Sequence, residues 1–593
     1  MRLLTIAILC TLAVGASAQR LPTGREIRPA GKQMELDTFP MRAALVDGKR
    51  LALILHSGFR PANLRLIDVE TGRRVAEAPL QDAGVDFAYD TKARRIYVAG
   101  GHAARVVVYR LGGEGIDDAT LVPDGSFPSD AVGTPLAAAP AQMASLALSP
   151  DGSTIAALEP RADRITFFET QNGRVLRRIE GVGRPAHAVF SEDGRHLYVA
   201  SATESAVVHY EVATGRRQGS QAVAAGPAFL LRRERRIFVA CANSNYVDLL
   251  QLTSEGGIGP GRRLNLAFAP DYPNGLSPTA LAWDEESSSL LVTLSDANAI
   301  ARLRFPEGAA TPETELVPTG WYPTFALPLP GVRLFVLNAK GFGSRPNPRG
   351  PNPTQHATMT PQPPSDIEYT PLIQDGGGQL VEKLSADGKR EATQTVLRLN
   401  HVPSAGKSES ASVREGFVPW GGSPSPIRHV IYIMKENRTY DQVLGDLEQG
   451  NGDASLCLFP EKITPNHHKL TRDFTLFDNF YANADVSSEG WHWSSAATVP
   501  HFVMRNWPAA YAGRTRLLRD GAPATRGSRS ENEEDAFSAP GSGYLWTRAL
   551  DRGLAVRNFG FFVRNRAGAQ VGEEQLESVS DPRWLVAELA FKV

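Results

Sequence analysis

Glu436 and Asn437 have the oxygen-bearing side chains that a divalent cation prefers. They follow "HVIYIM" (429–434), an apolar and mostly β-branched run that predicts a strand buried in an α/β sheet. Loops at the carboxyl edge of such a sheet are where ligand sites form. The same two residues also suit the start of a helix at 439–448, with Asn437 as its cap. Spacing alone favours neither interpretation.

A second polar group, Asn466, His467 and His468, lies in "TPNHHKL" (464–470). Histidine pairs often bind cations. Adjacent residues on a helix, however, point in different directions, so the pair rarely chelates one ion. We therefore interpret this group as packing and capping at the start of a helix, with a metal site as the alternative.

Length and composition limit the classes of protein to which this chain can belong. The chain has 593 residues, which indicates two or more domains, and it is 42% apolar and 21% charged, as soluble globular proteins are. The net charge is −1, so the composition gives no indication of a nucleic-acid or anionic-membrane partner.

The first 18 residues have the pattern of a signal peptide. Arg2 supplies the positive charge, Leu3–Val14 the apolar stretch and Ala16–Ala18 a small-residue cleavage site before Gln19. A second apolar segment of spanning length does not follow. We expect an exported protein, periplasmic or secreted, with no membrane span after cleavage.

An internal repeat occupies the region 30–340. "SPDGSTIAAL" (149–158) recurs as "SEDGRHLYVAS" (191–201), and seven such units of short strands and tight turns can be counted. A repeat of this length predicts a seven-bladed β-propeller, with a β-sandwich as the alternative. The "SPDG…IYVA" pattern resembles the YVTN family of β-propeller repeats. Propellers serve as binding platforms, as enzymes or as spacers, so the fold does not indicate the function. The ligand of this propeller is unknown.

The amino-acid composition changes between 341 and 426. The segment 343–366 is rich in Pro and Asn and predicts a linker, whereas 380–400 predicts a last hairpin that closes the ring. "GGSPSP" (421–426) is typical of a hinge. From 427 to 593 a parallel-type strand, a helix and denser aromatic residues predict an α/β domain.

"HVIYIMKENRTYDQVLGDL" (429–447) is similar to the opening of the phosphoesterase family of phospholipases C and acid phosphatases, within the alkaline phosphatase superfamily. "ITPNHHKLTRDFTLFDNFY" (463–481) and "VSSEGWHWS" (486–494) extend the match. The resemblance implies that Glu436 and Asn437 bind a divalent cation of unknown identity. It implies that Ser487, or alternatively Ser488, is the nucleophile in hydrolysis of a phosphate ester through a phosphoseryl intermediate.

His492 is the candidate that the resemblance implies for contact with substrate phosphate. The family's commoner Gly-His-Asn-Trp reads "GWHW" (490–493) here, which weakens this assignment. The superfamily's later Asp and His ligands have no counterpart after Ser487. We therefore expect an α/β domain cut off before its metal site is complete. Two functions follow: an exported metal-dependent phosphoesterase with a propeller for binding, or a propeller binding protein with an inactive phosphoesterase part.

Overall fold

The computed structural model describes residues 19–129, 142–270, 272–307, 311–350, 367–402, 427–514, 543–558, 563–565, 576–578 and 585–586. The signal peptide predicted at 1–18, the hinge at 421–426 and most of the linker at 343–366 lie outside these residues.

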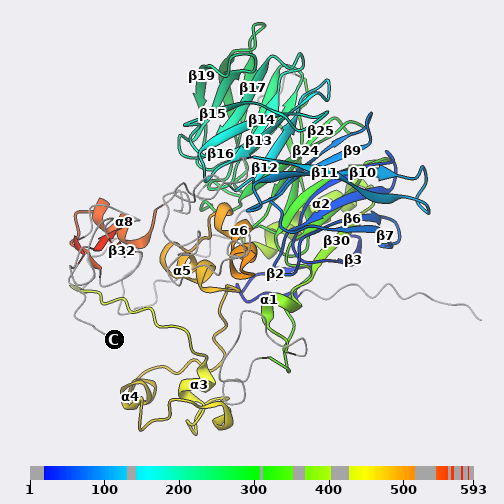
Figure 1. Ribbon diagram of the computed structural model, residues 1–593. Coiled ribbons are helices and arrows are strands. Elements are labelled where there is room, and N and C mark those ends of the chain that lie inside the picture. The colour runs from blue at the N-terminus through cyan, green and yellow to red at the C-terminus, as the bar shows by residue number, and fades with distance from the viewer. Residues whose placement is uncertain are drawn as a thin grey trace, which may run out of the picture.

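A ring of seven four-stranded antiparallel sheets makes up most of the described residues, which confirms the predicted β-propeller (Figure 1). Each sheet is one blade, and in six of the seven pairs of neighbouring blades the first strands contact each other around the centre. The first six blades are β4 (Pro40–Leu45) to β7 (Arg74–Pro79) with β5 (Leu51–His56) and β6 (Asn63–Asp68); β8 (Phe87–Asp90), β9 (Arg95–Ala99), β10 (Arg105–Gly112) and β11 (Thr120–Pro128); β12 (Ser145–Leu148), β13 (Thr154–Glu159), β14 (Arg164–Glu169) and β15 (Val175–Glu180); β16 (Pro185–Phe190), β17 (His196–Ser201), β18 (Ala206–Glu211) and β19 (Arg217–Ala222); β20 (Pro227–Arg233), β21 (Arg236–Cys241), β22 (Tyr246–Leu252) and β23 (Ile258–Asn265); and β24 (Pro278–Asp284), β25 (Ser289–Leu294), β26 (Ala299–Arg304) and β27 (Glu313–Pro318).

The seventh blade closes the ring with strands from both ends of the propeller. It contains β28 (Pro323–Leu329), β29 (Arg333–Asn338), β30 (Gly376–Val381) and, as its outermost strand, β3 (Lys32–Leu36). The propeller therefore extends past 340, the boundary predicted from the repeat. Two short paired strands, β1 (Gln19–Arg20) and β2 (Glu26–Ile27), precede the propeller in the sequence.

The repeated Asp-Gly turns explain why the units recur. Ser149 Oγ donates to Asp151 Oδ1 at 2.6 Å, and Ser191 Oγ donates to Asp193 Oδ1 at the same distance. Gly152 and Gly194 follow with φ of +75° and +72°, a conformation that favours glycine. The same residues thus form the same turn in successive blades.

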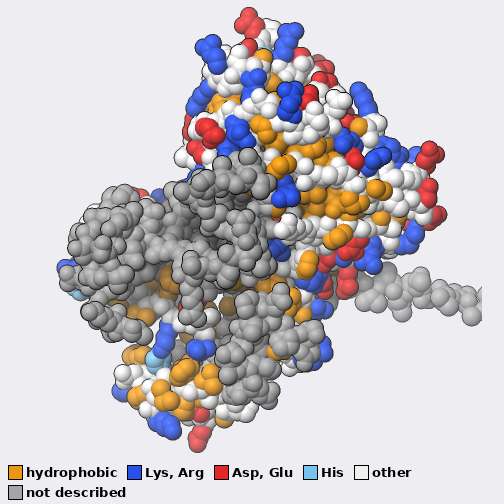
Figure 2. Space-filling view, in the orientation of Figure 1, with side chains coloured by type: hydrophobic (Ala, Val, Ile, Leu, Met, Phe, Trp, Pro, Cys, Tyr) orange, Lys and Arg blue, Asp and Glu red, His pale blue; other side chains and the backbone are white. Residues whose placement is uncertain are grey.

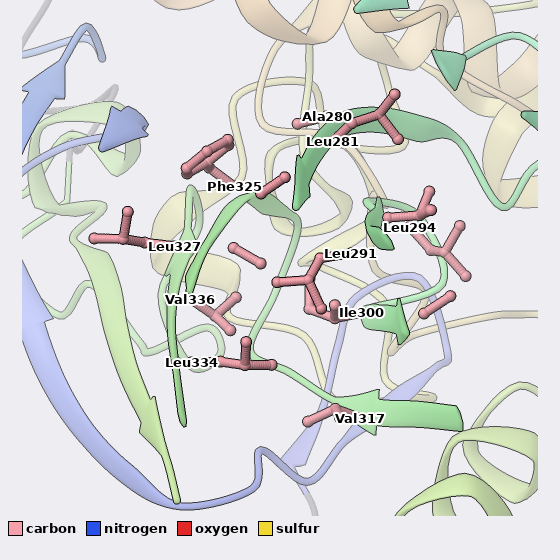
Figure 3. Close-up of a cluster of buried hydrophobic side chains, with 14 of the residues drawn as sticks. Ala280, Leu281, Leu291, Leu294, Ile300, Val317, Phe325, Leu327, Leu334 and Val336 are labelled. Atoms are coloured by element: carbon pink, nitrogen blue, oxygen red, sulfur yellow. The ribbon is translucent and has the colours of Figure 1, made fainter. Parts of the chain in front are cut away.

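The main core lies between blades, where alternate strand residues of adjacent sheets interdigitate. Figure 3 shows part of the cluster between the sixth and seventh blades, which includes Leu291 and Ile300 of the sixth blade and Phe325 and Val336 of the seventh. All four side chains are buried. Burial of this kind is the dominant stabilising contribution to a propeller.

The region predicted as a linker with a closing hairpin contains different elements. Short α1 (Thr370–Ile373) precedes β30, and α2 (Ala386–Leu399) follows it and packs against β27. The hairpin predicted at 380–400 is therefore wrong: most of that segment is α2. Ser385 caps this helix by accepting from Gly388 N, and Val396 and Leu399 are among its buried residues.

The regular elements described after 427 are mainly short helices. They are α3 (Tyr440–Leu444), η1 (Ala454–Leu456), α4 (Pro465–Asp473), α5 (Ser487–Ala496), α6 (His501–Tyr511) and α8 (Leu545–Asp551). Two two-stranded sheets accompany them, formed by β31 (Arg557–Asn558) with β34 (Leu585–Val586) and by β32 (Val563–Asn565) with β33 (Leu576–Ser578). The larger α/β sheet predicted for 427–593 is not present in these residues.

The strand predicted at 429–434 is also absent from the structure. The segment is extended but unpaired, and Val430, Ile431 and Ile433 are 79%, 86% and 78% exposed. A β-branched run forms a strand only where a neighbouring strand supplies backbone hydrogen bonds. Here the neighbouring element is the helix α5, which offers no strand to pair with, so the segment 429–434 does not form a strand.

Helices α5 and α6 lie against the propeller (Figure 1). Val499, Val503 and Trp507 pack with Phe39 and Tyr322 in one buried cluster. None of the helices in the described part of the chain has the length and apolarity needed to cross a bilayer. On the face of the molecule in Figure 2, basic and acidic side chains are interspersed over the propeller.

Candidate functional site

The predicted nucleophile and a predicted metal ligand lie next to each other. Ser487, the first residue of α5, donates from Oγ to Glu436 Oε2 at 2.7 Å. The two residues are 51 positions apart in the sequence. The fold therefore brings together two side chains that the sequence places in separate segments.

Helix α5 holds the segment around Glu436 in place. Trp491 Nε1 donates to Glu436 Oε1 at 3.0 Å, and Tyr432 Oη donates to the carbonyl of Ser494 at 2.6 Å. Both contacts come from residues on the surface of α5 that faces the 429–437 segment. Glu436 therefore accepts one hydrogen bond on each carboxylate oxygen, and its orientation toward Ser487 is fixed.

Ser488, the alternative nucleophile, is placed differently. Its side chain is fully buried, and its Oγ has no hydrogen-bond partner within the described structure. Its backbone N–H donates to Tyr511 Oη at 3.1 Å. A buried hydroxyl without a base beside it is a poor nucleophile, so the geometry favours Ser487.

His492 lies on the buried face of α5. Its Nδ1 is 2.7 Å from the carbonyl of Ser488, and its Nε2 is 3.3 Å from Tyr544 Oη. Both ring nitrogens are engaged within the protein. The predicted contact with substrate phosphate is untested, and this arrangement does not favour it.

The group at 466–468 forms a helix start. His468 is buried in α4; its Nε2 is 2.9 Å from Asp446 Oδ1 and its Nδ1 is 2.9 Å from the carbonyl of Thr464. Burial lowers the pKa of His468, but the Asp446 carboxylate outweighs it and raises that pKa above the usual value. These contacts agree with the packing interpretation of this group.

Glu436 and Asn437 alone do not fit a divalent metal. Across the described ranges, no three or more His, Cys, Asp and Glu side chains gather where an ion could bind. A hard cation needs about six oxygen ligands, and carboxylate count sets much of its affinity. One carboxylate, already engaged with Ser487 and Trp491, and one exposed amide fall short of that. Metal dependence remains a prediction.

A buried ion pair fixes α5 to the propeller. Lys340, two residues after β29, contacts Asp485 Oδ2 at 2.6 Å and Glu489 Oε1 at 2.9 Å. Burial would lower the pKa of Lys340, but the two carboxylates raise it above its usual value. Burial raises the pKa of Glu489 to about 7; the Lys340 cation opposes this shift and the negative charge of Asp485 adds to it.

A cavity of about 470 Å³ lies at the centre of the propeller. The beginnings of the innermost strands line it, and α6 covers it through His501, Phe502 and Arg505. Arg42, Asp86 and His187 lie among its lining residues. Its size suits a small-molecule ligand.

The repeat itself aims side chains into this cavity. Five innermost strands begin with proline, and each has a β-bulge between that proline and the residue two positions later, which lines the cavity. Bulges re-aim side chains in this way next to functional sites. The residues so placed are Arg42, His187, Phe229, Ala280 and Phe325. Sequence reasoning missed them, although the recurring proline two positions before each is visible in the repeat.

The comparisons with known proteins concern the fold. Neither a family model nor a curated protein matches this chain. Similar solved structures include hydrazine synthase of Kuenenia stuttgartiensis (15% identity, 52% of this chain and 94% of that chain, TM-score 0.41). They also include the periplasmic gluconolactonase of Pseudomonas aeruginosa (18%, 46% and 84%, 0.38) and virginiamycin B lyase of Staphylococcus aureus (15%, 51% and 95%, 0.39). At such identities and scores we infer nothing about activity from them.

Proposed function

We propose that this protein is an exported phosphoesterase in which Ser487 is the nucleophile and the propeller provides a binding platform. The hydrogen bond from Ser487 Oγ to Glu436 Oε2 carries the proposal. It joins the two side chains to which the family resemblance gives the leading roles. Nothing in the local sequence of either segment requires that contact.

The pair can begin a phosphoryl transfer. Ser487 Oγ attacks the phosphorus of a phosphate ester while Glu436 accepts the hydroxyl proton. The ester P–O bond breaks, and the leaving oxygen takes up that proton, so the product departs as an alcohol. Water then attacks the phosphoserine, which releases phosphate and restores the hydroxyl. In the proposal Glu436 and Asn437 also hold a divalent cation, which would lower the pKa of the serine hydroxyl and polarise phosphoryl oxygens. These two residues alone fall short of the oxygen ligands that such a cation needs, and no further His, Cys, Asp or Glu side chains gather beside them among the described residues.

The test compares Ser487→Ala with Ser488→Ala in hydrolysis of 4-nitrophenyl phosphate, with Mg²⁺, Ca²⁺, Mn²⁺ or Zn²⁺ added. The two serines are adjacent in α5, so each variant controls for the other. We expect S487A to lose hydrolysis and S488A to keep it. Mass spectrometry of acid-quenched protein should find phosphate on Ser487. Equal rates in the parent and S487A would exclude this serine as the nucleophile.

A second candidate function is ligand binding by the propeller, with no hydrolysis at Ser487. The central cavity favours it, because the cavity is covered by α6 and lined partly by charged side chains. The discriminating result is a chain that binds ligand in the cavity but turns over no phosphate ester with any of the four cations.

A further inference from the structure

Arg42 lies at the cavity wall between two aromatic rings. Its guanidinium carbon is 4.9 Å from the centroid of Phe229 and 4.2 Å from that of Phe325. All three residues occupy the same position of their blades, two residues after the strand's first proline. Rings on both sides hold the guanidinium in one orientation by cation–π attraction. The repeat thus presents a fixed cation to the cavity.

The hydrogen-bonding capacity of Arg42 is only partly used. Its Nε is 3.3 Å from Asp86 Oδ1, but its Nη1 is buried and has no partner in the described structure. Asp86 also accepts from Ser145 Oγ at 2.9 Å and lies 3.4 Å from His187 Nε2. The backbone N–H of Phe87 donates to Asp86 Oδ1 as well, at 2.9 Å, so one carboxylate serves four donors. A buried guanidinium N–H without an acceptor costs free energy, which a ligand oxygen would recover.

Arg505 supplies a second incompletely satisfied cation from α6. The side chain is buried, its Nε has no partner in the described structure, and its Nη2 makes only a long contact of 3.5 Å to the carbonyl of Thr324. Burial and the positive charge of Arg42 lower its pKa to about 10, against the opposing effects of Tyr322 and Asp86. Arg42 and Arg505 both line the cavity. At neutral pH Arg505 is still charged.

The lining as a whole is positive. Three arginines, Arg42, Arg184 and Arg505, face one acid, Asp86. Burial lowers the pKa of His187, although Asp86 opposes this, and burial lowers that of His501 as well. His187 Nδ1 accepts from the backbone N–H of Leu230 at 3.2 Å, which fits a neutral ring. Among the described lining residues, the charges of Arg42 and Arg505 therefore outweigh the single charge of Asp86.

We propose that the central cavity binds a small molecule with an anionic group, a carboxylate or a phosphate, between Arg42 of the first blade and Arg505 of α6. Guanidinium groups bind either anion with paired N–H donors. Phe229 and Phe325 provide apolar surface for the remainder of the molecule. Helix α6 is part of the site, so the segment after 427 completes a binding site that the propeller begins.

The experiment is calorimetric titration of the full chain with benzoate and with phenyl phosphate. Benzyl alcohol, which has the ring without the charge, is the neutral control. The S487A background removes hydrolysis of phenyl phosphate, and benzoate binding in it should equal that of the parent, because Ser487 is not among the cavity's lining residues. Failure of the proposed phosphoesterase would thus leave this result unchanged. The two anions distinguish a carboxylate site from a phosphate site.

We expect saturable binding of at least one anion and weaker binding by about tenfold or more in Arg42→Met and in Arg505→Met. Ala228→Trp fills the cavity without removing an arginine and should also abolish binding. Arg304→Met removes an exposed arginine of the sixth blade and should bind as the parent does. If either arginine variant fails to fold, A228W supplies the comparison. No binding up to about 10 mM, or equal affinity in A228W and the parent, would overturn the proposal.

Discussion

Lys340 of the seventh blade and Glu489 of α5 form a fully buried ion pair, with Nζ 2.9 Å from Oε1. Asp485 shares the same cation at 2.6 Å, and the ring of Trp321 lies 5.1 Å from it. Glu489 Oε2 also accepts from the backbone N–H of Asp485 at 2.7 Å, which fixes the start of α5. Because Ser487 lies between the two acids, this pair positions the candidate nucleophile relative to the propeller.

Replacing Lys340 with methionine should release α5 from the propeller. The substitution keeps the length of the side chain but leaves two buried carboxylates without a cation, which costs about 3 to 5 kcal/mol. Denaturant unfolding monitored by fluorescence measures the change. Lys389→Met, which breaks the half-exposed pair with Glu315, should cost less than about 1 kcal/mol. An equal effect of both substitutions would show that the buried pair does not fix the helix.

The stability of the parent should fall as pH rises from 5.5 to 8. Burial raises the pKa of Glu489 from 4.5 to about 7, so the folded state holds a proton that the unfolded state releases. That contribution is fully present below 4.5, is lost as pH rises through about 7, and is at most about 3 kcal/mol. Glu489→Gln cannot titrate, and thermal unfolding of E489Q should lack this part of the slope. Identical slopes would contradict the assignment.

The propeller could be predicted because its turns are local. Ser149 and Asp151 form their hydrogen bond within a few residues, and the same letters recur where the same turn recurs. Closure by β3 could not be predicted, since Lys32–Leu36 lies far from β30 in the chain and resembles no repeat unit. The strand predicted at 429–434 was wrong for a related reason: a sequence pattern does not show whether a neighbouring strand exists.

In the candidate site, too, local features could be predicted from the sequence and contacts between distant segments could not. The contact of Ser487 with Glu436 was implied only through a family resemblance, because neither segment shows where the other lies. Arg42 and Arg505 come from the first blade and from α6, and their convergence depends on closure of the whole ring. The proline at the start of five innermost strands is visible in the sequence as a recurring residue. Its consequence, a side chain aimed at the centre, required the structure.

Trp507→Ala should weaken the docking of α6. Trp507 is buried and packs edge-to-face on Phe39 of the propeller, with ring centroids 6.4 Å apart and an interplanar angle of 85°. Loss of a buried tryptophan costs about 3 to 5 kcal/mol. Denaturant unfolding measures the loss, and limited proteolysis should cut the variant sooner within 501–511. Phe474→Ala removes an exposed aromatic ring and should change stability by less than about 0.5 kcal/mol.

Ring closure at the seventh blade should depend on Gly378 of β30. A Cβ there would lie 2.8 Å from Phe335 Cζ and 2.9 Å from Met34 Cγ, one on the neighbouring strand β29 and one on β3. Because Phe335 is fully buried and cannot move aside, Gly378→Val should separate the last two strands and cost about 1 to 3 kcal/mol.

Gly219→Val is the matched control for G378V. Gly219 lies in β19, the outermost strand of the fourth blade, and a Cβ there would meet nothing within 4 Å. Valine suits an exposed strand, so G219V should be neutral or slightly stabilising. Thermal unfolding and amide hydrogen exchange at β3 read out both variants, and faster exchange should appear in G378V alone. Unchanged exchange at β3 in G378V would mean that contacts elsewhere than β30 hold the N-terminal strand in the ring.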